Sequence, residues 1–81
     1  MKELIDTCKP MISKDYKERF RAEYYQTKIR RDKLSKMILD YNSGKLEFEP
    51  NNIYLLKIQL SSMNTYLDIL ELRAINEEIE L

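Results

Sequence analysis

The chain of 81 residues has no histidine and no tryptophan, and it has only one cysteine and one glycine. Without histidine it cannot build a Ser-His-Asp triad, a Cys-His pair or a His-ligated metal site. Cys8 alone cannot form an internal disulfide, and a single glycine excludes a glycine-rich phosphate loop. We therefore predict that the chain is not an enzyme and carries no metal and no cofactor.

Long hydrophobic runs are also missing. No stretch approaches the roughly 20 apolar residues of a transmembrane helix, and none has the apolar core of a secretory signal. The single thiol of Cys8 is typical of a reducing compartment. We therefore expect a cytoplasmic protein that makes no membrane contact.

The charges balance, but they are unevenly distributed. Residues 1–44 hold 11 Lys and Arg against 7 Asp and Glu, whereas residues 45–81 hold 3 against 7. Opposite signs predict that the two halves meet, within one chain or between chains. A basic first half that is free to bind nucleic acid is the alternative.

Two long stretches lack helix breakers. Asp15 followed by Glu18 is typical of a capping box at a helix start, and Gly44 suits the position after a helix end. Pro50 with Asn51 or Asn52 is typical of a second helix start. We predict helices over about residues 15–42 and 52–78, joined by a connector over residues 43–51.

Residues 1–12 precede the first long helix and are expected to form a short helical arm. Pro10 should stop this helix, since proline disrupts the regular hydrogen bonding of a helix interior. Leu4, Ile5 and Cys8 would then form the apolar edge that packs on the rest of the single domain of residues 1–81.

Both long helices repeat apolar residues at alternating steps of three and four, which is typical of a packed helix face. If the chain turns back at the connector, seven pairs of residues have numbers that add to 94. They are Tyr41–Ile53, Ile38–Leu56, Leu34–Leu60, Arg31–Met63, Thr27–Leu67, Tyr24–Leu70 and Phe20–Ala74. We call these fourteen residues the seam, and they predict an all-α fold: a long antiparallel helical hairpin.

Further apolar residues lie off the seam: Ile58, Ile69, Leu72, Ile75 and Ile79 on the second helix, and Tyr25, Ile29 and Met37 on the first. A hairpin of this length buries too little surface to fold alone. We therefore predict that the chain forms a homo-oligomer, most simply a dimer, as a helical bundle.

Six residues are candidates for binding a ligand or a partner. Lys28, Arg30 and Arg31 could hold an anion, although Arg31 could equally be a polar seam residue that fixes the register. Tyr25, Tyr54 and Tyr66 fall outside the seam, and tyrosine is a frequent interface anchor. Incidental surface exposure is the alternative for each of them.

Two segments carry a family resemblance: YKERFRAEYYQTKIRRDKL, residues 16–34, and QLSSMNTYLDILELR, residues 59–73. Over residues 15–75 the chain resembles a family of small, uncharacterised bacteriophage helical-hairpin proteins named after a member from a crAss-like phage. The resemblance implies a phage origin and action in the cytoplasm of a host bacterium.

Three functions are compatible with these observations. The first is an accessory protein that binds and blocks a host protein, such as a component of anti-phage defence. The second is an oligomeric sponge that sequesters an anionic nucleotide signal through Lys28, Arg30 and Arg31. The third is a weak nucleic-acid binder that uses the basic first helix.

Overall fold

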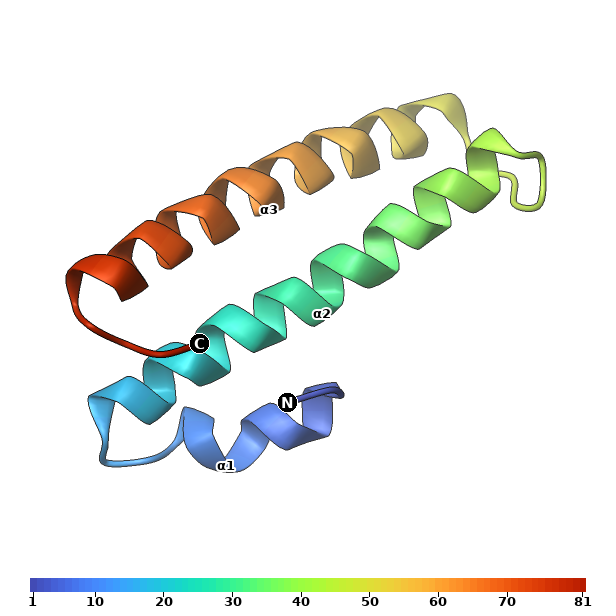
Figure 1. The fold of residues 1–81 in the computed structure, drawn as a ribbon. Helices are drawn as coiled ribbons and strands as arrows, with labels where there is room; N and C mark the ends of the chain where they lie inside the picture. Colours follow the sequence, from blue (N-terminus) through green and yellow to red (C-terminus); the bar gives the residue numbers. More distant parts are fainter.

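The computed structural model describes residues 1–81 and is entirely helical apart from its turns and ends. A short arm consists of the 3₁₀ helix η1 (Leu4–Thr7) and the one-turn helix α1 (Cys8–Met11). Two long helices follow, α2 (Tyr16–Asn42) and α3 (Pro50–Asn76), and they run in opposite directions (Figure 1). The predicted all-α hairpin is confirmed. None of the helices is both long and apolar enough to cross a bilayer.

The start of α2 agrees with the prediction except for one contact. Asp15 caps the helix, because its carboxylate accepts a hydrogen bond of 2.9 Å from the backbone N–H of Lys17. The backbone N–H of Asp15 donates to Oγ of Ser13 at 3.1 Å. The prediction that Glu18 closes a capping box is therefore wrong, since Ser13 takes its place.

The connector ends α2 as predicted. Gly44 follows the helix with a φ of 82° and donates its N–H to the carbonyl of Tyr41 at 3.0 Å. Glycine adopts this left-handed conformation without the steric cost that other residues incur.

Helix α3 lies two residues earlier than predicted at both ends. It begins at Pro50, whose fixed φ suits the first helical position, so neither Asn51 nor Asn52 is the cap. It ends at Asn76 because Glu78 has a φ of 57°. The turn lets the N–H of Ile79 donate to the carbonyl of Ala74 at 2.8 Å.

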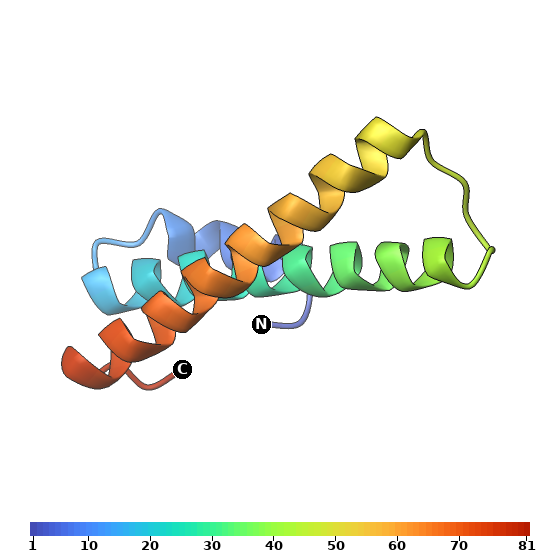
Figure 2. The same ribbon diagram turned by 90° about the horizontal axis from the view of Figure 1, so that it is seen from above.

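The core has two parts between α2 and α3. One contains Phe20, Tyr24, Leu67, Leu70, Ala74 and Ile79, and the other contains Leu34, Ile38 and Ile53 with half-buried neighbours. All fourteen seam residues are buried or half-buried. The two helices cross and diverge toward the connector in Figure 2. Ile79 belongs to this core and not to an outer face as predicted, because the turn at Glu78 folds it inward.

The arm packs against α2, which leaves Thr7 and Ala22 almost fully buried. Two expectations about the arm are wrong. Its apolar edge is not formed by Ile5 and Cys8, which are exposed. Pro10 lies inside α1, because a proline in the first turn of a helix has no intrahelical hydrogen bond to lose.

Candidate functional site

A groove runs between α2 and α3 toward the connector, and we call it the loop-end groove. It has two adjoining parts of about 320 and 370 Å³ that share Met37, Leu56 and Gln59. Most of the lining is apolar, and the polar or basic residues are Arg30, Lys33, Asn52 and Gln59. The residues that the two parts do not share are Leu4, Arg30, Lys33, Leu34 and Met63 in one part, and Phe48, Asn52 and Leu55 in the other. Volumes of this order suit small-molecule ligands.

The charge of the loop-end groove is entirely positive. Arg30 and Lys33 line the part near the arm, and no Asp or Glu lines either part. Both cations are exposed, and neither forms an ion pair or donates a hydrogen bond within the chain. Their donors are therefore free for an anion that enters the groove.

The other end of the loop-end groove offers different chemistry. Phe48 is half-buried there and packs against Tyr41, with the ring centroids 6.1 Å apart. The side-chain amides of Asn52 and Gln59 lie in the same part. An aromatic ring can stack on a planar base, and an amide can both donate and accept hydrogen bonds. The groove thus combines features that recognise an anion with features that recognise a heteroaromatic ring.

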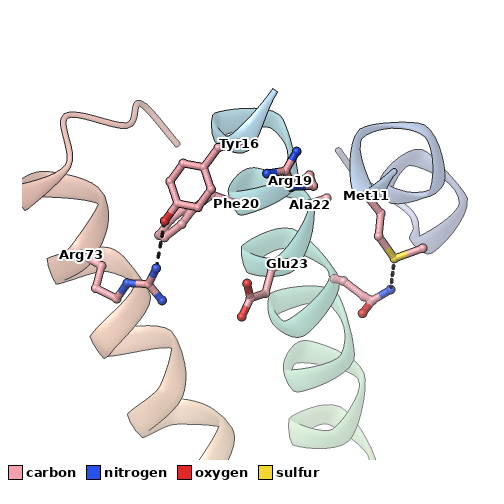
Figure 3. Close-up of a pocket in the computed structure, with 8 residues that line it drawn as sticks. Met11, Tyr16, Arg19, Phe20, Ala22, Glu23 and Arg73 are labelled. Carbon is pink, nitrogen blue, oxygen red and sulfur yellow. Dashed lines mark hydrogen bonds between the residues drawn. The ribbon is translucent and has the colours of Figure 1, made fainter. Parts of the chain in front are cut away.

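A second hollow, of about 390 Å³, lies where the arm, α2 and α3 meet, and we call it the junction pocket (Figure 3). Met11 reaches from the arm toward Gln26, whose amide nitrogen lies 3.9 Å from its sulfur. Arg19 also lines this pocket, but it donates to the carbonyl of Ser13 at 2.7 Å. The junction pocket is therefore less available to an anion than the loop-end groove.

Tyr16, Arg73 and Glu77 form a hydrogen-bonded clasp beside the junction pocket. The hydroxyl of Tyr16 donates to Oε1 of Glu77 at 2.6 Å. It also accepts from a terminal nitrogen of Arg73 at 3.0 Å (Figure 3). Nε of Arg73 also donates to Glu77 at 3.2 Å. The clasp ties the start of α2 to the end of α3.

The clasp shifts the titration of all its members. The hydrogen bond from Tyr16 lowers the pKa of Glu77, and the same bond raises the pKa of the Tyr16 hydroxyl. The bond to Glu77 raises the pKa of Arg73. Each shift favours the protonation state that the contact requires: neutral tyrosine, ionised glutamate and charged arginine. The clasp holds its members in these states, which leaves none of them poised for proton transfer near neutral pH.

The structure does not bring the three predicted basic residues together. Arg30 lies in the loop-end groove, whereas Arg31 is bound at 2.8 Å to Oδ1 of Asp32 and at 2.8 Å to Oδ1 of Asn64. Lys28 is half-buried, has no hydrogen-bond partner and lines neither hollow. Residues two apart point to nearly opposite sides of a helix, which separates Lys28 from Arg30.

The three predicted tyrosines also lie apart from one another. Tyr25 is half-buried and packs edge-on against Tyr24, with the ring centroids 5.1 Å apart. Tyr54 and Tyr66 are both exposed on α3. Only Arg30 among the six predicted residues lines a hollow.

Lys33, Gln59 and Phe48 line the loop-end groove but were not predicted from the sequence as site residues. Lys33 follows Arg30 by three residues, a spacing that places both on one helix face, so this signal was present. No sequence signal marked Gln59 and Phe48 as site residues, because their place in the groove depends on how α3 crosses α2. No three Asp, Glu or Cys side chains come together as a potential set of metal ligands.

The fold, the loop-end groove and the junction pocket define the chain as a small all-helical hairpin protein with ligand-sized sites on its surface. The chain belongs to the Sequestin family, which it matches over residues 14–76. The match covers both long helices and the connector and leaves out the arm. The family name refers to sequestering, which is a binding role. Comparison with curated proteins and with solved structures gave no match.

Proposed function

We propose that the protein sequesters an anionic nucleotide in the loop-end groove and so withholds it from its receptor. The observation that carries this proposal is the pair of unpartnered cations, Arg30 and Lys33, in a groove without a carboxylate. Phosphate oxygens would bind these cations, and the base would stack on Phe48. The family name supports a sequestering role.

The proposal makes the protein a binder and not an enzyme. A sequestering protein returns its ligand chemically unchanged, so it needs no nucleophile or proton donor. The resemblance to bacteriophage proteins supports an action in the cytoplasm of an infected bacterium. The withheld molecule would there be a nucleotide signal of the host.

Thermal melting with a panel of linear and cyclic nucleotides tests the proposal. A ligand that binds only the folded chain raises its melting temperature by mass action. Isothermal titration of the best ligand should then show at least a tenfold weaker affinity for Arg30→Ala and for Lys33→Ala.

Two control variants sharpen this test. Lys36→Ala removes a charge from the same helix but outside the groove, where Lys36 pairs with Asp40 at 3.1 Å, and it should bind normally. Lys28→Ala should also bind normally. If Lys28→Ala weakens binding and Lys33→Ala does not, the ligand lies on the other flank of α2. If no nucleotide changes the melting curve, the proposal fails.

Blocking of a host protein is the second candidate, and the exposed apolar residues of α3 favour it. Tyr54 and Leu55 are 65% and 60% exposed, and large exposed apolar surfaces often mark protein interfaces. A tagged chain should then retain one host protein from a bacterial lysate, and Tyr54→Ala should lose it. Nucleic-acid binding through α2 would show itself by an affinity that falls steeply with salt.

A further inference from the structure

The outer face of α3 carries an exposed stripe that reads nearly the same in both directions. Its members follow the three-four alternation of a helix interface. In chain order they are Asn51, Leu55, Ile58, Ser62, Thr65, Ile69, Leu72 and Asn76, and every one of them is exposed. Neither α2 nor the arm covers this side of α3 in Figures 1 and 2. We call these eight residues the outer stripe.

We propose that the outer stripe binds the outer stripe of a second copy of this chain, antiparallel and about a two-fold axis between Ser62 and Thr65. A two-fold interface requires a self-complementary surface. In this register the paired residue numbers add to 127, so Leu55 meets Leu72, Ile58 meets Ile69 and Ser62 meets Thr65 of the second copy. Every layer pairs like with like.

The size gradient along the outer stripe also fits a helix pair. Ser62 and Thr65 are small and lie at the centre, where they let two helices approach closely, and the larger Ile and Leu flank them. Asn51 and Asn76 close the stripe with polar side chains at both ends. A stripe that faced only water would have no reason to be apolar in this symmetric order.

The residues beside the outer stripe contain no like-charge conflict. In antiparallel helix pairs the flanking positions face their counterparts across the contact. This arrangement sets Tyr54 against Ile75, Ser61 against Asp68 and Gln59 against Tyr66 of the second copy. Tyr54 and Ile75 are 65% and 76% exposed in the single chain, so their pairing would cover more apolar surface.

The apolar area is of the size that an interface needs. Tyr54, Leu55, Ile58, Ile69, Leu72 and Ile75 are each between 46% and 76% exposed. At on the order of 100 Å² each they supply about 600 Å² per chain, near the roughly 800 Å² per partner of a stable interface. This interface would also place Tyr66 of the second copy beside Gln59, at the rim of the loop-end groove.

Light scattering of Leu72→Glu against Leu39→Glu tests the interface. The two leucines are matched in exposure, at 66% and 64%, but Leu39 lies on α2 outside the outer stripe. Wild type and Leu39→Glu should show twice the chain mass of 9.8 kDa, and Leu72→Glu should show the mass of one chain with unchanged helical circular dichroism. A monomeric wild type overturns the proposal, as does a Leu72→Glu variant that keeps the wild-type mass.

Disulfide trapping tests the direction of the pair. In a Cys8→Ser background, a mixture of Ser62→Cys and Thr65→Cys chains should form the mixed disulfide in preference to either homodimer. Preferred homodimers of both variants would show a parallel pair and overturn the register. The interface does not require the proposed ligand, so the mass measurement and the nucleotide titration can fail separately.

Discussion

The hydroxyl group of Tyr16, at the start of α2, bonds to two charged side chains at the end of the other long helix, Arg73 and Glu77. Tyr16→Phe removes only this hydroxyl group, so the melting temperature should fall by a few degrees at neutral pH. Tyr54→Phe is the matched control, because the Tyr54 side chain is exposed and its hydroxyl has no partner within the chain. Equal melting temperatures of Tyr16→Phe and wild type would show that the clasp adds nothing to stability.

The stability difference between wild type and Tyr16→Phe should depend on pH, because the pKa of Glu77 is shifted. A carboxyl group whose folded pKa lies below its ordinary value of 4.5 adds stability above that value and loses it as the pH falls through the folded pKa. Tyr16 has a raised pKa, so its contribution persists below pH 10.0 and is lost only above it. The difference between wild type and Tyr16→Phe should therefore be constant between pH 6 and 9 and shrink in strong acid.

Helix α3 depends on side chains at the centre of its inner face. Leu67 is 2% exposed and belongs to the larger part of the core. Leu67→Ala should lower the free energy of unfolding in urea by about 2–5 kcal/mol, the usual cost of deleting buried methyl groups and leaving a cavity. Leu39→Ala, at an exposed site of α2, should change it by less than about 0.5 kcal/mol. Similar losses in both variants would contradict the assigned seam.

The connector depends on one backbone conformation at Gly44. A Cβ atom added at this residue would meet nothing within 4 Å, so a substitution is opposed only by the φ of 82°. Gly44→Ala should lower the free energy of unfolding by about 1 kcal/mol, and Gly44→Asn by less, since asparagine tolerates the left-handed region better. An unchanged urea midpoint in Gly44→Ala would mean that the connector relaxes at no cost.

At the scale of the whole molecule, the sequence predicts the hairpin well, because the regular period of a helix determines which residues share one face. The three-four spacing is enough to place Phe20 and Leu34 on the same inner face. The loop-end groove could not be predicted in the same way, since Leu4 and Lys33 become neighbours only through the packing of the arm on α2. The clasp could not be predicted either, because Tyr16 and Glu77 are 61 residues apart in the chain and meet only through the packing of α2 on α3.

The basic and the acidic half of the chain meet as predicted, but no ion pair joins them. Helices α2 and α3 do lie side by side, yet all three ion pairs join residues one or four apart within one half: Arg31–Asp32, Lys36–Asp40 and Arg73–Glu77. Contacts between the halves are hydrogen bonds, such as those from Lys17 and Arg21 to the carbonyls of Glu78 and Glu80. The packing of the core therefore holds the halves together more than their charge does.

Salt should consequently have little effect on the stability of the fold. Exposed local ion pairs contribute about 0–1 kcal/mol each, and charges farther apart than about 10 Å are already screened at roughly 0.1 M salt. Raising NaCl to about 1 M should change the free energy of unfolding by less than about 1 kcal/mol. Urea titrations at both salt concentrations measure this directly. A loss of several kcal/mol would show that attraction between the two halves stabilises the hairpin, whereas nucleotide binding at Arg30 and Lys33 should weaken with salt in either case.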